Sequence, residues 1–199
     1  MSDLVTLRGL LGLPATPAPL SQSALVLVDC QNTYRRGMMQ LSAVEPALEQ
    51  CQQLLARARR LKIPIIHIQH DAGPGTPYDV RADIGMIADK VAPANGEPVI
   101  TKNYPNSFLN TNLHEQLQAL QVKNLVIVGF MTHMCISSTA RAAFDLGYAN
   151  TVVAAATATR NLPLLNDEEV AAEQVQRSAL AALADLFAIV LHDQSNLPD

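Results

Sequence analysis

The chain has 199 residues, of which 49% are hydrophobic and 16% charged, which fits one domain with a sizeable core. Its formal net charge is -4, and its one dense basic run, residues 57–62, lies on an expected helix whose other face is apolar, so nucleic-acid binding is disfavoured. No apolar run approaches the roughly 18 to 20 residues that span a bilayer, and the first residues lack a secretory pattern. We therefore expect a soluble, cytoplasmic protein.

The order of the expected elements predicts an α/β fold. Residues 1–23, with Pro14, Pro17 and Pro19, are expected to form an N-terminal arm, and residues 24–199 a single domain. In that domain, apolar runs typical of strands buried on both faces alternate with amphipathic helical runs, which favours a mainly parallel sheet. The expected strands are 24–29, 64–69, 98–101, 124–129, 151–155 and 186–191.

Helices are expected where apolar residues recur three or four positions apart. The first such stripe comprises Leu48, Cys51, Leu55 and Ala58. The second comprises Leu113, Leu117 and Leu120. A later helix is expected to begin at Asn166, because Glu169 would complete a variant of the capping box. The residues of this helix that would face the sheet are Ala171, Val175 and Ala182.

One long connection, residues 71–98, has little periodicity and contains four glycines and four prolines. Structureless connections longer than about 15 residues are uncommon in compact domains unless they form lids or binding loops. We therefore expect this segment to cover a site.

The three cysteines lack the spacing of a disulfide framework or a zinc site, so each is expected to be a free thiol. Cys135 follows Thr132 just beyond an expected strand, where Thr132 would cap a helix and Cys135 would lie in its first turn. The positive end of that helix would lower the pKa of the thiol from about 8.5. A buried core position is the alternative, since free cysteines commonly pack as small apolar residues.

Two further reactive residues also lie where a strand ends. Asp29 closes the first expected strand, and Lys102 lies one residue beyond the third. Ligands of open parallel sheets bind at the carboxyl ends of strands, so both would share an edge with Cys135. A carboxylate can take a thiol proton and an ammonium can hold a thiolate, which predicts nucleophilic catalysis. The alternatives are a capping role for Asp29 and a solvated charge for Lys102.

From Ser23 to His192 the chain resembles the isochorismatase-like cysteine hydrolases, a superfamily that includes nicotinamidases and N-carbamoylsarcosine amidases. The resemblance rests on three motifs in matching order and spacing: DCQNTY from Asp29, TKNYPNSF around Lys102, and GFMTHMC ending at Cys135. It implies a Rossmann-like, three-layer α/β/α fold whose six-stranded parallel sheet has the order 3-2-1-4-5-6.

The resemblance also implies an active site. Asp29 would be the base, Lys102 its electrostatic partner and Cys135 the nucleophile. A cis peptide is implied between Phe130 and Met131, with the backbone N–H groups of Met131 and Cys135 forming an oxyanion hole. The implied reaction hydrolyses a carbon–nitrogen bond of a small amide, carbamoyl or ureido compound through a thioester, without a cofactor, in a homo-oligomer.

The expected substrate pocket has aromatic walls. Its candidates are Tyr34, Phe108, Phe130 and His133, with Arg160 as a further candidate and a core role as the alternative for the aromatic residues. A Cys–His dyad is disfavoured, because His133 and Cys135 lie two residues apart and would face different ways on a helix. Cys30 and Cys51 are expected in the core.

We expect no metal site. Nicotinamidases of the superfamily hold a divalent ion through an Asp-x-His pair, and the matching positions here are His70 and Ala72. His67, His70 and Asp71 could still suggest a site, yet His67 lies inside an expected strand and no further ligand follows at useful spacing.

Three alternatives to an amide hydrolase can be stated. A vinyl-ether hydrolase of the isochorismatase type shares the fold, but relatives with that activity often lack the cysteine. A non-catalytic, ligand-binding oligomer is disfavoured because all three polar residues are retained. A dinucleotide-binding dehydrogenase is set aside, since the turn after the first strand lacks the GxGxxG pattern.

Overall fold

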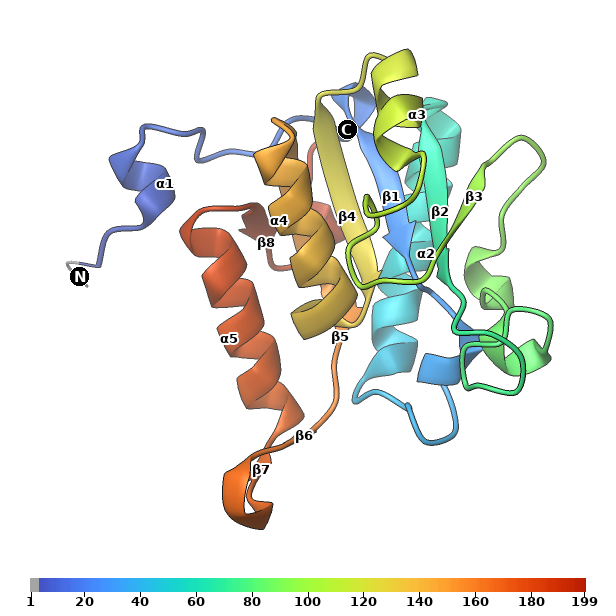
Figure 1. Cartoon of the computed structure of the whole chain (residues 1–199). Helices are drawn as coiled ribbons and strands as arrows, with labels where there is room; N and C mark the ends of the chain where they lie inside the picture. The colour runs from blue at the N-terminus through green and yellow to red at the C-terminus, as the bar shows by residue number, and fades with distance from the viewer. Residues whose placement is uncertain (1–3) are drawn as a thin grey trace.

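A computed structural model describes residues 4–199 of the chain. Its centre is a parallel sheet of six strands in the order β3-β2-β1-β4-β5-β8 (Figure 1). The strands are β1 (Ala24–Val28), β2 (Ile65–His70), β3 (Val99–Lys102), β4 (Asn124–Phe130), β5 (Ala149–Ala158) and β8 (Ile189–Leu191). The predicted order is confirmed, because β8 is the sixth strand of the sheet along the chain.

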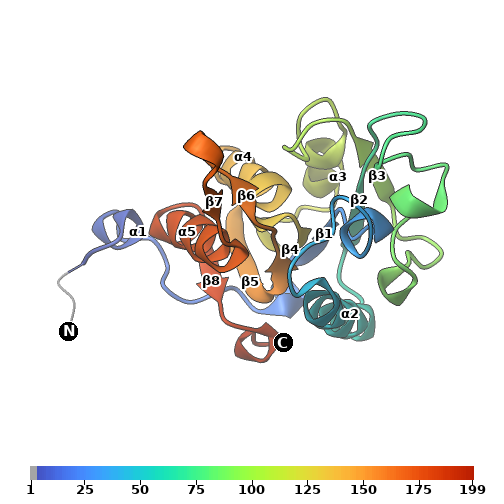
Figure 2. The ribbon, with the colours of Figure 1, turned by 90° about the horizontal axis from the view of Figure 1, so that it is seen from below.

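Helices cover both faces of the sheet, so the three-layer prediction is confirmed. Figure 2 shows α2 (Val44–Leu61) on one side of the strands and α3, α4 and α5 on the other. The bounds of the latter three are α3 (Leu113–Ala119), α4 (Ser137–Asp145) and α5 (Ala172–Asp185). A hydrophobic core lies on each face of the sheet, and alternate residues of β1 pack into one or the other: Leu25 and Leu27 on the α2 side and Val26 on the opposite side. Because both faces are buried, the strand is apolar throughout.

The helical stripes explain how α2 and α3 pack. In α2 the four predicted core residues, Leu48, Cys51, Leu55 and Ala58, are all buried against the sheet. In α3 the prediction holds for Leu113 and Leu117, which are buried. Leu120 lies just beyond the last residue of α3 and is 51% exposed, so it does not belong to the core.

The predicted start of the last long helix at Asn166 was wrong. Asn166 has φ 60° in a tight turn, whereas a helix N-cap requires extended backbone. That turn joins β6 (Leu162–Pro163) to β7 (Glu169–Val170), a small hairpin that precedes α5. The cap comes from across the hairpin: Asn161 Oδ1 accepts a hydrogen bond from the backbone N–H of Ala172.

The later start also changes which residues of α5 face the sheet. The buried residues of α5 are Ala172, Val175 and Leu183. Of the three predicted, only Val175 is among them, because Ala171 and Ala182 are exposed.

The segment before β1 runs along the body of the domain. It contains the short helix α1 (Leu7–Leu10), so the predicted arm includes a helical turn (Figure 1). The Leu7 N–H donates to Asp185 Oδ1, and Arg8 donates to the carbonyl of Leu186, which ties the segment to the end of α5. Residues 1–3 of the predicted arm lie outside the described residues. Within residues 4–199, no helix has the length and apolarity to cross a bilayer.

A glycine shapes the sheet edge at which the predicted reactive residues lie. Gly129 has φ +112°, and a Cβ at this position would lie 2.0 Å from the carbonyl oxygen of Val28. Only glycine permits this approach of β4 to β1. The pairing of β4 with β5 also shifts register between Ile127 and Gly129. The backbone is therefore redirected just before Phe130.

Candidate active site

Three strands bring Asp29, Lys102 and Cys135 together at the carboxyl edge of the sheet. Lys102 Nζ lies 2.7 Å from Asp29 Oδ2 and donates to Cys135 Sγ at 3.3 Å. Asp29, Lys102 and Cys135 are 0%, 1% and 4% exposed, so this candidate triad is enclosed. Within residues 4–199, neither oxygen of Asp29 has a hydrogen bond of good geometry. The contact with Lys102 is thus an ion pair that leaves carboxylate lone pairs able to accept a proton.

Cys135 lies in a wide helical turn rather than in the first turn of an α-helix. Thr132–Ile136 form a π-helical turn, and α4 begins after it at Ser137. The carbonyl of Met131 accepts hydrogen bonds from the amides of Met134 and Ile136, the latter being the five-residue bond of a π turn. The predicted N-cap at Thr132 was therefore wrong: the cap residue is Met131. The peptide bond between Phe130 and Met131 is cis, as the resemblance implied.

Burial dominates the electrostatics of the candidate triad. It raises the pKa of the Asp29 carboxyl, and the charge of Lys102 offsets part of that rise. Burial also raises the pKa of the Cys135 thiol to about 12; Asp29 adds to this rise and Lys102 opposes it. The predicted lowering of the thiol pKa was wrong, because desolvation exceeds the effect of the helix end. At neutral pH the site holds a protonated thiol beside a group that can take its proton.

The ammonium of Lys102 has a third neighbour that the sequence did not indicate for this role. Its Nζ lies 3.1 Å from Nδ1 of His70, the last residue of β2. The carboxamide of Gln31 holds the backbone of His70 from both sides: Oε1 accepts from the His70 N–H, and Nε2 donates to the His70 carbonyl, each at 2.9 Å. The ends of β1, β2 and β3 are thereby joined around one cation.

Residues 71–98 cover this edge of the sheet, as predicted. Gln31 Nε2 donates to the carbonyl of Gly85 at 2.6 Å, and the Ala88 N–H donates to the carbonyl of Cys30 at 2.8 Å. Gly85 lies so near another part of the segment that a Cβ would be 2.2 Å from the carbonyl oxygen of Asp79. The segment also brings Tyr78 to the site, where its ring meets His70 edge-on at a centroid distance of 5.1 Å.

Residues 23–195 match the isochorismatase domain family. This chain belongs to the isochorismatase family. A crystal structure of an isochorismatase from Pseudomonas putida is 38% identical, with a TM-score of 0.91 over 94% of this chain and 96% of that one. A secreted isochorismatase effector of Verticillium dahliae is 35% identical over 90% of this chain and 93% of its own length. A ureidoacrylate amidohydrolase of Stutzerimonas stutzeri is 31% identical, covering 73% of this chain and 75% of its own length.

Membership of the isochorismatase family identifies the chain as a hydrolase. The three motifs that suggested the resemblance lie within the matched residues. They supply the ends of β1, β3 and β4, which is why residues far apart in the sequence meet in one site.

The predicted pocket residues of this isochorismatase-family domain separate into two groups. Tyr34 lies beside the site, with its ring edge-on to Tyr78 and to Phe130, each at 5.9 Å. Phe130 itself is fully buried in the core on the α2 side. Phe108 stacks on Tyr148 at 5.9 Å, a contact that packs the segment before α3 against the segment after α4. Tyr78 meets His70 and Tyr34 meets Tyr78, so both tyrosine rings lie beside the candidate triad.

His133 lies at the side of the site and is half-buried. Its Nδ1 lies 2.6 Å from Thr159 Oγ1, so its partner is a residue after β5 rather than Cys135. Burial lowers the pKa of His133, and the nearby charge of Arg160 lowers it further. The argument against a Cys–His dyad agrees with this arrangement.

The remaining predicted cysteines and histidines have structural contacts. Cys30 and Cys51 are both buried in the core on the α2 side, as expected. His67 lies inside β2, and its Nε2 is 2.9 Å from Glu97 Oε2. Asp71 Oδ1 accepts a hydrogen bond from the Gly73 N–H, which closes the turn after β2.

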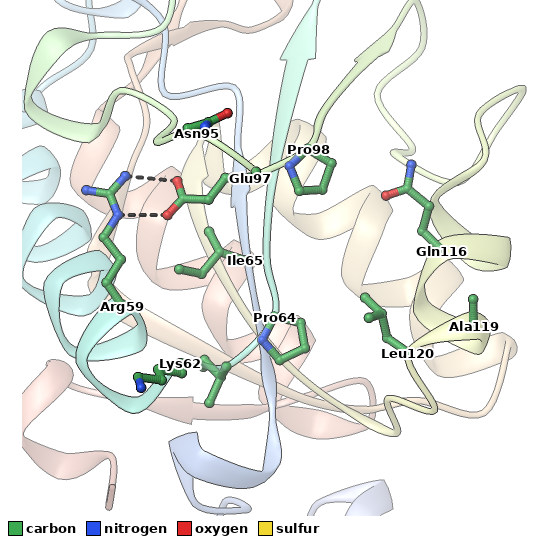
Figure 3. Close-up of a pocket in the computed structure, with 12 residues that line it drawn as sticks. Arg59, Lys62, Pro64, Ile65, Asn95, Glu97, Pro98, Gln116, Ala119 and Leu120 are labelled. Atoms are coloured by element: carbon green, nitrogen blue, oxygen red, sulfur yellow. Dashed lines mark hydrogen bonds and ion pairs between the residues drawn. The ribbon is translucent and has the colours of Figure 1, made fainter.

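A surface hollow of about 770 Å³ lies at the opposite, amino-terminal edge of β2 and β3 (Figure 3). Its one charged cluster is Arg59 with Glu97, two parallel hydrogen bonds of 2.8 and 2.9 Å. Glu97 also accepts a hydrogen bond from the Ala94 N–H. These bonds lower the pKa of the Glu97 carboxyl to about 2, and the bond from Arg59 has the largest effect. The groups of this cluster are hydrogen-bonded to one another and to residues 92–98, so among the described residues that line the hollow there is no reactive group comparable to the candidate triad.

Proposed function

We propose that this chain hydrolyses a carbon–nitrogen bond of a small amide, carbamoyl or ureido compound through a thioester on Cys135. The observation that carries the proposal is the placement of Lys102 Nζ, 2.7 Å from Asp29 Oδ2 and 3.3 Å from Cys135 Sγ, in an enclosed site. A thiol, a carboxylate and an ammonium at these distances can act as nucleophile, base and electrostatic partner.

The proposed first step forms the thioester. Asp29 takes the thiol proton as Sγ bonds to the carbonyl carbon, and the carbonyl electron pair moves to oxygen. Lys102 and the backbone N–H groups of Met131 and Cys135 stabilise that oxyanion; in other hydrolases such donors contribute about 3 to 4 kcal/mol each. When the intermediate collapses, the carbon–nitrogen bond breaks and the nitrogen leaves as ammonia or an amine with the proton from Asp29.

The proposed second step releases the acid. Asp29 takes a proton from water while the water oxygen attacks the thioester carbonyl. The carbon–sulfur bond then breaks, and the proton passes from Asp29 to Sγ. The raised pKa of the Asp29 carboxyl suits this alternation between base and acid, since a catalytic group works best when its pKa is near the operating pH.

We further propose that the substrate carries a carboxylate. Arg160 follows β5, and its charge lowers the pKa of His133 and offsets part of the rise in the pKa of Tyr78, so the guanidinium acts on both of these side chains. Its Nε is buried and, within the described part of the chain, has no hydrogen-bond partner. A buried donor without a partner favours an anionic ligand. The relative named as acting on ureidoacrylate has such an acid as its substrate.

The substrate proposal is tested with a matched pair of amides, one acidic and one neutral, of similar shape. We expect Arg160→Gln to raise KM for the acidic member by about tenfold to a hundredfold, the range for a hydrogen bond to a charged group. The neutral member should be little affected. Arg141→Gln serves as the control, since Arg141 lies over the ring of Phe187. Equal losses for both amides would contradict the proposed carboxylate contact.

The proposed reaction is tested by an ammonia-release screen over small amides, N-carbamoyl amino acids and ureido acids. We expect turnover by the wild-type chain and none by Cys135→Ala. Cys51→Ala is the matched control, because Cys51 is a core thiol of α2 and should keep the activity.

Two outcomes of the screen would replace the proposal. Silence across the screen with turnover of isochorismate would favour vinyl-ether hydrolysis. Silence on both, with ligand binding retained in Cys135→Ala, would favour a non-catalytic binding role.

The assembly and location of the chain also stay predictions. We expect a homo-oligomer, which light scattering on the purified chain would test. We expect a cytoplasmic location, which fractionation would test; a secreted relative makes this test informative.

A further inference from the structure

The ammonium of Lys102 has three N–H bonds and three recorded neighbours. Asp29 Oδ2 lies at 2.7 Å, His70 Nδ1 at 3.1 Å and Cys135 Sγ at 3.3 Å. Because an ammonium can only donate, Nδ1 of His70 must be the acceptor in its contact. This requires the tautomer of His70 that carries its hydrogen on Nε2.

The backbone of His70 is fixed independently of its imidazole. His70 ends β2, and its N–H and carbonyl are both hydrogen-bonded to the carboxamide of Gln31, two residues after Asp29. The imidazole ring meets the ring of Tyr78 edge-on, at an interplanar angle of 69°. The strand and the carboxamide hold the backbone of His70, and its imidazole lies between Tyr78 and Lys102 with Nδ1 toward Lys102.

The surroundings of His70 favour its neutral form. The charged or titratable groups near the imidazole are Lys102, Asp29, Asp71 and Tyr78. Burial lowers the pKa of His70, the charge of Lys102 lowers it further, and the two carboxylates offset part of the change. At neutral pH, Nδ1 therefore keeps the lone pair that an acceptor needs.

We propose that His70 is a positioning residue, which holds the Lys102 ammonium toward Asp29 and Cys135 by accepting one of its hydrogen bonds. The inference rests on the proposed function, because it assigns the role of Lys102 to that reaction. Without the acceptor, a buried N–H would lack a partner, and the ammonium would move from its place between carboxylate and thiol. His70 does not touch the reacting carbonyl in this account; it acts through Lys102.

The test measures alkylation of Cys135 by iodoacetamide at pH 7, with mass spectrometry of the modified peptide. It needs no substrate, so it can succeed or fail independently of the ammonia-release screen. His70→Ala removes the acceptor and the ring, and His70→Phe removes the acceptor but keeps an aromatic ring against Tyr78. His70→Asn keeps an acceptor, because the carboxamide oxygen can replace Nδ1. His114→Ala, at a histidine that contacts Tyr148, is the control.

We expect His70→Ala and His70→Phe to slow alkylation by about tenfold to a hundredfold, the range for a hydrogen bond to a charged group. His70→Asn and His114→Ala should stay close to the wild-type rate. If the access of iodoacetamide to Cys135 alone set the rates, His70→Ala would be alkylated fastest, because alanine leaves the most space around the thiol. Alkylation of His70→Ala as fast as that of His70→Asn would overturn the proposal.

A second readout uses the pH profile. Protonated His70 cannot accept from Lys102 and places a second cation beside it. The wild-type alkylation rate should therefore fall more steeply with acidification than that of His70→Asn, in which the side chain at position 70 does not titrate. Alkylation rates of wild type and His70→Asn that fall equally steeply with acidification would count against the proposal.

A measurement on the unmodified chain guards against variants that fail to fold. Nitrogen NMR of the histidine side chains distinguishes the two neutral tautomers. We expect His70 to carry hydrogen on Nε2 and none on Nδ1 at neutral pH. The opposite tautomer would overturn the proposal whatever the variants show.

Discussion

Replacing Lys102 by methionine tests whether the candidate triad contains a buried ion pair. Asp29 and Lys102 are 0% and 1% exposed, and their side chains lie 2.7 Å apart. Removing one partner of such a pair costs about 3 to 5 kcal/mol, because the other charge stays buried without compensation. For a chain of this size, that loss corresponds to a fall in Tm of about 6 to 20 °C. Methionine keeps most of the side-chain volume, so a cavity contributes little.

The loss in Lys102→Met should grow as the pH rises. The pKa of the Asp29 carboxyl is already raised by burial, and Lys102 opposes that rise, so the variant has a still higher folded-state value. A carboxyl whose pKa is raised on folding contributes stability below its unfolded value, about 4, and that contribution is lost as pH rises through the folded value. The gap between wild type and variant should therefore be larger at pH 8 than at pH 5.

Urea unfolding at both pH values measures this gap. The double variant Asp29→Asn, Lys102→Met removes both charges and should recover most of the lost stability. Arg177→Met is the control, since Arg177 and Glu173 form an exposed pair 3.9 Å apart and the midpoint should not change. A wild-type midpoint for Lys102→Met at pH 8, or no recovery in the double variant, would refute the buried ion pair.

Three further predictions concern the backbone at Gly129 and the thiol of Cys135. Gly129→Ala should strongly destabilise the fold or prevent folding, because φ at this position is +112° and a Cβ would lie 2.0 Å from the Val28 carbonyl oxygen. Gly147→Ala is the control: φ there is +87° and nothing lies within 4 Å of the added Cβ, so the loss of unfolding free energy in the same urea titration should be smaller. Because the pKa of the Cys135 thiol is about 12, its alkylation rate should still be rising from pH 8 to pH 10. A plateau below pH 9 would contradict this. The Asp29 charge raises the pKa of the Cys135 thiol, so Cys135 of the Asp29→Asn variant should be alkylated faster than that of wild type at pH 9.

The sheet and the candidate triad could be predicted because both depend on local signals. Apolar runs mark the strands, and the rule that ligands bind at the carboxyl ends of parallel strands places Asp29, Lys102 and Cys135 on one edge. That argument needs no knowledge of which helix packs where. The three residues meet as expected.

Two of the failed predictions share a different cause, contacts between residues distant in the chain. The start of α5 is set by Asn161 from across a hairpin, so the local capping pattern at Asn166 was misleading. The pKa of the Cys135 thiol depends on how deeply the fold buries it, which the position of a helix end does not reveal.

The residues that the sequence did not assign to the site show the same limit. Tyr78 reaches the site only because residues 71–98 fold over it, and nothing in its neighbours distinguishes it from a loop tyrosine. His70 was considered as a metal ligand, because the sequence shows its residue type but not its contact with Lys102. The pocket role of Phe108 stays a prediction, and its ring stacks on that of Tyr148.

The central claim, a covalent intermediate on Cys135, is tested most directly by the mass of the intact chain after brief incubation with a mixed amide library. We predict an added mass equal to one acyl group, mapped by peptide analysis to Cys135, and none in Cys135→Ala. Turnover of the same amides by Cys135→Ala, or an adduct carried by another residue, would contradict the account.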